Sequence, residues 1–305
     1  MKVNFVLPKP VFGISGGYKV VYDYANMLTV RGDDVVIYYS LWGQNNRNIP
    51  RFIYYIIEDF IRFVEPRWFK VYCEKKLLFD FEDRYIRNAD VIVATAAITA
   101  DGVNKFSEAK GTKFYLIQDI EFWEGKDLVI DSYKLEMKNI AISKYIKSVV
   151  DNYSETPAFY VPNGIDLTEM YVQNKIEDRK QYSVCMYYDP NERKGVKYRI
   201  EAIISLKKQL PDMYVTCFGS DDRPDVLPTW VDYICRANRD EVRWIYNDHA
   251  IYINSTIEEG FGLTGLESMA CGCCLVTSEY EAVKEYAVDK HNCLMSSVKN
   301  VGGLV

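Results

Sequence analysis

The chain has 305 residues, about twice the length of a typical domain, so it is long enough for two domains with separate hydrophobic cores. Its 37 Lys and Arg residues against 43 Asp and Glu residues give a net charge of −6, which excludes the excess positive field that non-specific nucleic-acid binding uses. Hydrophobic residues make up 49% and charged residues 26%, as is typical of a globular protein rather than a disordered or fibrous one.

Short runs of β-branched and aromatic residues alternate with helical stretches along the chain. In the first half, strands are expected at Val3–Leu7, Val35–Tyr39, Val91–Thr95, Lys113–Gln118 and Asn139–Ile142. In the second half, they are expected at Tyr182–Tyr187, Tyr214–Phe218, Val231–Ile234, Ala250–Ile253 and Cys274–Thr277. Continuous apolar strands separated by helices indicate parallel sheets covered on both faces. We therefore predict an α/β protein with two doubly wound, Rossmann-like domains.

A turn-rich segment separates the two series of strands. Pro162 and the Asn163-Gly164 pair are strong turn signals, and a polar stretch follows to about Gln181. We place a first domain at residues 1–160, a junction at 161–181 and a second domain at 182–305. Because ligands of open α/β sheets bind beyond the carboxyl ends of the strands, functional residues are expected in the loops that follow strands.

Residues 51–87 depart from the alternation, because aromatic and basic residues are interleaved there against the acidic background of the chain. The basic members include Arg62, Arg67, Lys70, Lys75 and Lys76. Two helices packed on the first sheet, with solvated charged faces, are the simpler interpretation, since aromatic stripes usually belong to cores. The alternative is a surface that touches a membrane or a lipid-linked substrate.

No apolar run approaches the roughly 18 residues that a membrane span requires. The first seven residues have the pattern of a strand rather than of a signal peptide. We therefore expect a cytoplasmic protein, with a peripheral membrane contact through residues 51–87 as the alternative.

The segment from Ile253 to Cys273 carries the most chemical information. A strand ends near Asn254, a loop with Gly260 and Gly262 follows, and helical periodicity begins near Thr264. A helix N-terminus presents unpaired N–H groups and a positive dipole, which suit a phosphate group.

Two carboxylates, Glu259 and Glu267, flank this turn. The glycines place Glu259 in the loop and Glu267 in the first helical turn, so that both can face the same cleft. The pattern therefore indicates a phosphate site with carboxylates beside it for sugar hydroxyls.

The run EGFGLTGLESMACG at 259–272 resembles the Glu-x7-Glu signature of the retaining GT-B glycosyltransferases of family four, also called glycosyltransferase group 1. Three further elements resemble the same family in the same order, namely Ser15-Gly-Gly17, VPNGID at 161–166 and Arg193-Lys-Gly195. The segment IQDIE at 117–121 resembles a loop of members that build polysaccharides, including rhamnosyltransferase-like ones. The resemblance implies the GT-B fold, in which two Rossmann-like domains face each other across a cleft.

The resemblance also implies roles for individual residues. Glu267 would hold the ribose hydroxyls of a nucleotide sugar, and Glu259 would lie near the hydroxyls of the donor sugar as a catalytic residue. Arg193 and Lys194 would neutralise the leaving diphosphate through charge-assisted contacts. The other implied donor-binding residues are Phe261, Gly262, Leu263, Thr264, Gly219, Ser220, Gly16 and Gly17.

Two acidic residues in the first half, Asp119 and Glu121, are candidates for the acceptor side. The alternative for both is a loop-capping carboxylate. The two histidines, His249 and His291, lie in no HExxH or Cys/His ligand pattern, so no metal site is expected. We interpret His249 as a polar residue at a helix–strand corner.

The expected reaction is transfer of a sugar, of the hexosyl type, from a nucleotide-sugar donor to a hydroxyl of a glycan or lipid-linked glycan, with retention of configuration. The sequence has no Asp-x-Asp motif, and the resemblance implies no metal and no cofactor, because backbone amides, Arg193 and Lys194 would take the place of a metal. No nucleic-acid partner is expected.

Two other functions remain open from the sequence, an inactive or truncated nucleotide-sugar-binding protein and a sugar-nucleotide epimerase of the same fold. Members of the family usually continue past the equivalent of Met295 with helices that return to the first domain. Because this sequence ends at Val305, the second domain is expected to be short at its C-terminal end.

Overall fold

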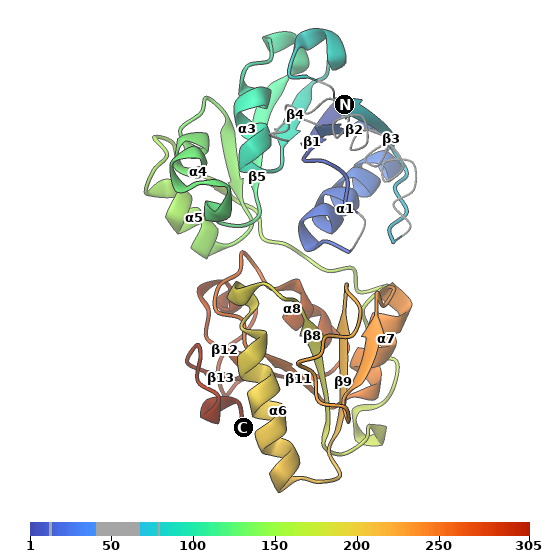
Figure 1. Cartoon of the computed structure of the whole chain (residues 1–305). Coiled ribbons are helices and arrows are strands. Elements are labelled where there is room, and N and C mark those ends of the chain that lie inside the picture. Colours follow the sequence, from blue (N-terminus) through green and yellow to red (C-terminus); the bar gives the residue numbers. More distant parts are fainter. Residues whose placement is uncertain (12–13, 41–67, 79) are drawn as a thin grey trace. The chain divides into compact units, whose positions relative to one another are not determined.

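The computed structural model describes residues 1–11, 14–40, 68–78 and 80–305, which form two compact units. The first unit runs from Met1 to Pro162 and the second from Asn163 to Val305 (Figure 1). Each unit is built around its own parallel β-sheet.

Within the described residues, the first unit contains a seven-stranded parallel sheet with the order β3-β2-β1-β4-β5-β6-β7. Its strands are β1 (Lys2–Leu7), β2 (Asp34–Ser40), β3 (Glu74–Leu78), β4 (Val91–Ala94), β5 (Thr112–Ile117), β6 (Lys138–Ala141) and β7 (Phe159–Tyr160). Its helices are α1 (Gly16–Val30), α3 (Ala97–Asn104), α4 (Lys126–Tyr133) and α5 (Lys144–Asp151). In β1 and β2 every residue after the first is buried, so both faces of the sheet are covered.

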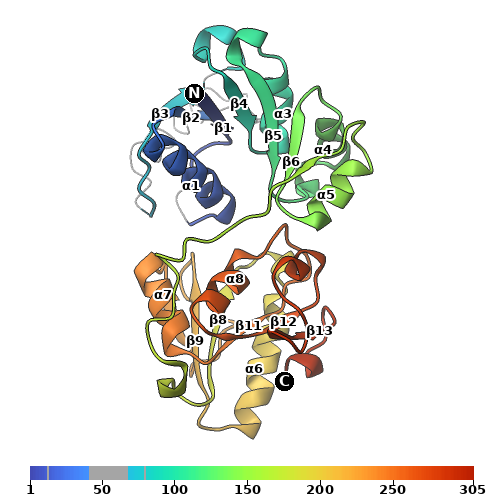
Figure 2. The same cartoon turned by 180° about the vertical axis from the view of Figure 1, so that it is seen from behind.

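The second unit, all of whose residues are described, contains a six-stranded parallel sheet with the order β10-β9-β8-β11-β12-β13 (Figure 2). Its strands are β8 (Ser183–Tyr188), β9 (Tyr214–Gly219), β10 (Asp232–Cys235), β11 (Ile251–Asn254), β12 (Cys274–Ser278) and β13 (Cys293–Ser296). Its helices are α6 (Val196–Gln209), α7 (Arg239–Asp248) and α8 (Leu263–Ala270). The two sheets confirm the predicted α/β class with two doubly wound, Rossmann-like domains.

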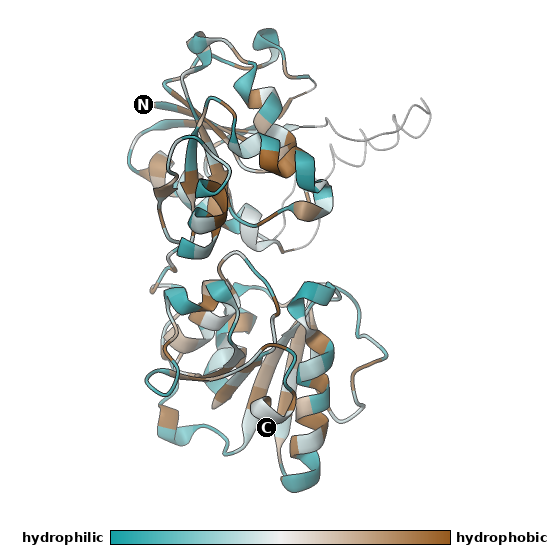
Figure 3. Cartoon of the chain, turned by 90° about the vertical axis from the view of Figure 1, so that its left-hand side faces the viewer, coloured by the Kyte–Doolittle hydropathy of each residue, from teal (hydrophilic) through white to brown (hydrophobic). Residues whose placement is uncertain are grey.

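The core of the second unit forms between α6 and the sheet. Ile200 and Ile203 of α6 belong to one buried cluster with Val184 and Met186 of β8 and Val215 of β9. Hydrophilic and hydrophobic patches alternate along α6, as expected for a helix with one face on the core (Figure 3). Removal of this apolar surface from water is the main stabilising contribution.

All ten predicted strands are present, with ends that differ by at most one residue, and among the described residues the sequence missed three others, β3, β7 and β13. β3 has the sequence EKKLL and lies at a sheet edge, where alternate residues are exposed, so it lacks an apolar run. β7 has two residues and both are exposed. β13 has four residues, of which only Cys293 is buried.

About half of the basic and aromatic region at 51–87 lies outside the described residues, including the whole of 51–67 with Arg62 and Arg67. The expectation of two helices is wrong for Glu74–Leu78, which form β3, because the open edge of β2 offers this segment a parallel strand to pair with. Trp68 and Phe69 pack against Tyr22 of α1, at ring-centroid distances of 5.7 and 5.4 Å. Among the helices of the described residues, none is both long and apolar enough to cross a membrane.

The strand order of the second sheet indicates at which edge of the sheet a ligand is expected to bind. The chain moves outward from β8 to β9 and β10, and then returns to place β11 on the other side of β8. At such a reversal the loops after the two central strands diverge to opposite faces and leave a crevice at the carboxyl edge. Here those loops are residues 189–195, called the β8 loop, and residues 255–262, called the β11 loop.

Candidate active site

The β8 loop and the β11 loop are in direct backbone contact. The Ile257 amide donates a hydrogen bond of 2.8 Å to the Arg193 carbonyl. Gly195 has a φ of +57°, and a Cβ there would lie 2.2 Å from the Ser255 carbonyl oxygen. Only glycine combines this backbone conformation with so close an approach. Gly195 therefore allows the two loops to pack against each other.

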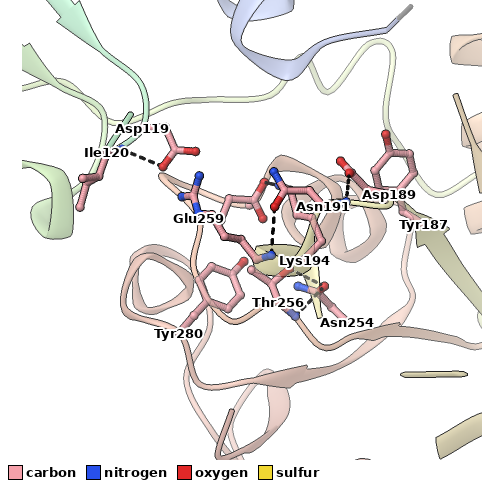
Figure 4. A network of polar contacts seen from close by, with 12 residues as sticks. Asp119, Ile120, Tyr187, Asp189, Asn191, Lys194, Asn254, Thr256, Glu259 and Tyr280 are labelled. Carbon is pink, nitrogen blue, oxygen red and sulfur yellow. Dashed lines mark hydrogen bonds and ion pairs between the residues drawn. The ribbon is translucent and has the colours of Figure 1, made fainter. Parts of the chain in front are cut away.

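Short polar side chains shape each loop. In the β8 loop the Asn191 amide donates to Asp189 Oδ1 at 2.9 Å, and the Arg193 amide donates to Asn191 Oδ1 at 3.0 Å. At the end of β11, Thr256 Oγ1 donates to Asn254 Oδ1 at 2.9 Å (Figure 4). Such Asx-type bonds stabilise turns locally, so the side chains between them project from loops of defined shape.

Lys194 and Glu259 form an ion pair across the two loops. Lys194 Nζ lies 2.5 Å from Glu259 Oε1, and the two side chains are 24% and 20% exposed (Figure 4). A pair that remains partly solvated contributes little to folding. It is also reachable by a ligand, and an incoming phosphate would compete with Glu259 for the ammonium group.

Helix α8 begins beside this pair. Gly262, the residue before the helix, has a φ of +94°, and a Cβ there would overlap the Tyr280 hydroxyl. Tyr286 donates a hydrogen bond of 2.8 Å to the Gly262 carbonyl. Burial raises the pKa of both tyrosines, so they stay protonated at neutral pH. The amides of Leu263 and Thr264 lie in the first turn, where a helix has no internal acceptors for them.

The Phe261 side chain is buried and packs on Tyr286, with ring centroids 5.8 Å apart. Only its backbone is therefore suited to ligand contact. Glu259 lies in the loop, as predicted, whereas Glu267 is the fifth residue of α8 and belongs to the second turn rather than the first. The helix starts at Leu263 because Gly262 ends the left-handed turn before it.

Glu267 is held by an arginine that the sequence did not reveal. Its side chain is 6% exposed, and Oε1 accepts a hydrogen bond of 2.8 Å from Arg239 Nη1. Arg239 Nη2 also lies 3.4 Å from Glu169 Oε2. Arg239 is the first residue of α7 and follows the capping residue Asn238. In the sequence it therefore resembles an ordinary solvated residue of a first helical turn, and nothing local indicates its contact with Glu267.

Gly219 and Ser220 lie at the carboxyl end of β9, beside the end of β8. Ser220 Oγ is 3.4 Å from the Tyr187 hydroxyl. A Cβ at Gly219 would lie 2.6 Å from the Tyr233 hydroxyl and 3.0 Å from the Tyr188 carbonyl oxygen. Packing between strand ends thus accounts for this glycine, and the same packing places Ser220 at the edge where the crevice opens.

Arg193, the second predicted cation, has its Nε 3.5 Å from Glu258 Oε2. The backbone carbonyl of Arg193 accepts a hydrogen bond from the β11 loop, and its side chain is 23% exposed. The backbone of this residue thus helps to hold the two loops together, while its side chain remains accessible to a ligand. The structure therefore brings Arg193, Lys194, Glu259 and the start of α8 together at one edge of the second sheet.

The other predicted residues belong to the first unit. Gly16 and Gly17 open α1 after Ser15, and the Gly17 carbonyl accepts a hydrogen bond of 3.1 Å from Gln118 Nε2. A Cβ at Gly17 would make only an ordinary contact, 3.6 Å from Gln118 Nε2. Among the described residues, no steric conflict would therefore exclude a larger side chain at position 17.

Asp119 and Glu121 follow β5 at the carboxyl edge of the first sheet. Asp119 Oδ1 accepts a hydrogen bond of 2.8 Å from the Ile120 amide, within its own turn (Figure 4). Glu121 Oε2 accepts one of 2.6 Å from the Ala97 amide and so caps α3. Burial, together with the charges of Asp119 and Glu124, raises the pKa of Glu121 to about 7. The loop-capping interpretation of these two carboxylates agrees with their contacts.

His249 ends α7 just before β11 and is fully buried. Its Nδ1 lies 2.7 Å from the Ile245 carbonyl oxygen, and its ring stacks on Tyr214 at a centroid distance of 5.1 Å. Burial lowers the pKa of the imidazole. The position agrees with the predicted helix–strand corner. Over the described residues, no group of three or more His, Cys, Asp or Glu side chains could hold a metal ion.

A family model for glycosyl transferases group 1 matches residues 182–305. The chain is 26% identical over 106 residues to the GtfA subunit of a UDP-N-acetylglucosamine–peptide N-acetylglucosaminyltransferase from Streptococcus pneumoniae. That match covers 33% of this chain and 21% of the relative, so the chain spans about a fifth of the length of that relative.

Solved structures resemble the whole chain at low sequence identity. Anabaena HepE in complex with UDP and glucose has a TM-score of 0.69 and 12% identity, with 100% of this chain and 88% of that chain covered. A mutant of S. aureus TarM in complex with fondaparinux, α-GlcNAc-glycerol and UDP has a TM-score of 0.73 and 7% identity, with 99% and 91% covered. Residues 182–305 are therefore similar to the glycosyl transferases group 1 family, and the chain has the two-domain GT-B fold of its structural neighbours.

Proposed function

We propose that this protein is a retaining glycosyltransferase that moves a sugar from a nucleotide-sugar donor to a hydroxyl group of a glycan. The observation that carries the proposal is the Lys194–Glu259 pair beside the start of α8, at the strand-order reversal of the second sheet. Nucleotides bind at this edge of α/β sheets. Here Lys194 and the unpaired amides at the start of α8 can bind phosphate, and Glu259 can accept hydrogen bonds from sugar hydroxyls.

In this proposal the donor diphosphate binds between Lys194, Arg193 and the first amides of α8. Glu267, whose Oε1 is held by Arg239, offers its remaining oxygen to the ribose hydroxyls. Glu259, released by Lys194 when phosphate arrives, accepts hydrogen bonds from the donor sugar. The UDP complexes of the structural neighbours support a uridine nucleotide as the first donor class to test.

The reaction breaks the bond between the anomeric carbon and the diphosphate oxygen, and forms a bond from that carbon to the acceptor oxygen. The acceptor proton passes to the departing phosphate oxygen on the same face of the sugar, so the reaction requires no protein nucleophile. The protein stabilises the charge that develops on the diphosphate through Lys194, Arg193 and helix amides. These groups supply the positive potential, and we propose that the reaction proceeds without a bound metal.

We assign the acceptor to the first unit, with Asp119 at the carboxyl edge of its sheet as a candidate contact. Glu121 acts there mainly through the cap that it provides for α3. The acceptor class is a glycan, either free or lipid-linked. Vesicles that carry a lipid-linked glycan, compared with the same glycan free in solution, distinguish these two acceptors.

Binding and turnover of UDP-sugars by the full chain test the proposal. A panel of UDP-sugars is titrated, and the release of UDP is followed with and without added glycan. Donor binding followed by glycan-dependent release of UDP supports a transferase. Binding without release supports the alternative of an inactive nucleotide-sugar-binding protein, and a change in the sugar without transfer supports an epimerase.

A further inference from the structure

Arg199 in α6 is the largest fully buried side chain of the described residues, at 2% exposure. Its guanidinium donates three hydrogen bonds. Nη1 reaches the Tyr187 carbonyl at 2.6 Å, Nη2 reaches the Lys194 carbonyl at 2.6 Å, and Nε reaches Ser255 Oγ at 3.0 Å. Ser255 Oγ in turn donates to the Gly195 carbonyl at 2.7 Å.

The charge of this guanidinium is not balanced by a carboxylate within the part of the chain that the structure describes. Its three acceptors are two backbone carbonyls and a hydroxyl. Two other cations of the candidate site differ from Arg199 in this respect, because Lys194 pairs with Glu259 and Arg239 pairs with Glu267. Burial of a charge without a counter-charge is unfavourable even after relaxation, so the position of Arg199 calls for an explanation beyond packing.

The three acceptors come from the carboxyl end of the central strand β8 and from the two loops that form the crevice. Tyr187 lies at the end of β8, Lys194 in the β8 loop and Ser255 in the β11 loop. Arg199 thus ties the backbone beneath Lys194 to both central strands. Its positive charge lies directly behind the residue that receives the diphosphate in the proposed function.

We propose that Arg199 is a positioning residue for the donor diphosphate, and this proposal rests on the proposed function. It holds the Lys194 backbone so that the ammonium group projects into the crevice. It also adds a buried positive potential that the arriving diphosphate offsets, in a region where charges are poorly screened. Both effects grow with the number of phosphate groups on the ligand.

Arg179 provides a matched control. It is 9% exposed and likewise donates to backbone carbonyls, those of Tyr246 at 3.1 Å and His249 at 2.9 Å among them. His249 precedes β11, so Arg179 lies at the amino edge of the sheet, opposite the crevice. The two arginines therefore share burial and bonding but differ in distance from the proposed phosphate site.

The experiment uses the full chain and compares UDP with UMP, which share the base and the ribose and differ by one phosphate. Calorimetric titration gives the ratio of the two dissociation constants for the native protein, Arg199→Met, Arg199→Lys and Arg179→Met, and thermal melting reports folding. We expect Arg199→Met to lose about tenfold or more in UDP affinity but less than about threefold in UMP affinity, so the ratio collapses. Arg199→Lys keeps the charge without the three bonds and should recover part of the ratio. Arg179→Met should lower the melting temperature and leave the ratio unchanged.

A native UDP to UMP ratio in folded Arg199→Met overturns the inference, as does an equal loss of both ligands or the same collapse in Arg179→Met. If Arg199→Met does not fold, Arg199→Lys decides, because a lowered ratio supports the inference and a native ratio overturns it. If the native chain binds neither UDP nor any other nucleoside diphosphate, the proposed function fails. If the native chain binds UDP and the ratio does not respond to Arg199, only the present inference fails.

Discussion

Glu121 links the stability of the first unit to pH. Its pKa is raised to about 7, mainly by burial, from an ordinary value of 4.5. The folded state therefore holds a proton that the unfolded chain releases above about pH 4.5. The contribution of Glu121 to the free energy of unfolding falls as the pH rises from about 4.5 to about 7 and is constant at higher pH, because in that window the unfolded state binds fewer protons at this residue.

The perturbation is Glu121→Gln, which removes the charge and keeps an oxygen that can accept the Ala97 hydrogen bond. At about 1.4 kcal/mol per pKa unit, the difference between about 7 and 4.5 sets an upper limit of about 3.5 kcal/mol. Glu121 is only partly buried, and solvent screening therefore reduces the effect below this limit. We expect the free energy of unfolding of the variant to exceed that of the native chain by about 1–3 kcal/mol at pH 8. At pH 4.5 the two should be equal.

Chemical unfolding at pH 4.5 and pH 8 measures this difference, with amide exchange in α3 as the report from the first unit. Glu155→Gln, at an exposed position of the first unit whose charge is not among those that raise the pKa of Glu121, is the control and should change nothing. A stability difference for Glu121→Gln that is the same at both pH values would refute the linkage.

Three further predictions concern the second unit. Gly195→Ala should cost several kcal/mol of stability, because φ is positive and a Cβ would lie 2.2 Å from a backbone oxygen, whereas Gly164→Ala, with no atom within 4 Å, should melt like the native chain. Lys194→Ala should lower turnover by about a hundredfold or more while the melting temperature changes little, and equal losses of both would contradict the assigned role. Glu267→Ala should weaken donor binding by about 1–3 kcal/mol, and Glu169→Ala, which removes the outer partner of the same arginine, should leave it intact; calorimetry with UDP checks both.

The sequence predicted those parts of the fold whose signal is local. β8 and β11 are continuous apolar runs with turns after them, and each is buried as a central strand of a parallel sheet must be. β3 has no such run, because an edge strand with the sequence EKKLL exposes alternate side chains to solvent. Its place in the sheet depends on pairing with β2, which lies more than 30 residues earlier in the chain.

The residues of the candidate site also fall into two groups, those that a local motif predicted and those whose contacts are distant in sequence. Lys194 and Glu259 were predicted because each belongs to a short local motif, Arg193-Lys-Gly195 and the run EGFGLTGLESMACG at 259–272. Their direct contact at 2.5 Å arises because their two loops meet at one strand-order reversal. Arg199 and Arg239 were missed because their partners are far away in sequence. Arg199 contacts Ser255 across 56 positions and Arg239 contacts Glu267 across 28, and neither arginine differs in its local pattern from a solvated helical residue.

The most direct measurement follows the anomeric configuration of the transferred sugar by proton NMR, with an α-linked UDP-sugar, a glycan acceptor and either the native chain or Lys194→Ala. The proposed function predicts an α-linked product that forms as UDP is released, and a rate that falls by about a hundredfold or more in the variant. A β-linked product, or a rate that does not depend on Lys194, would contradict it.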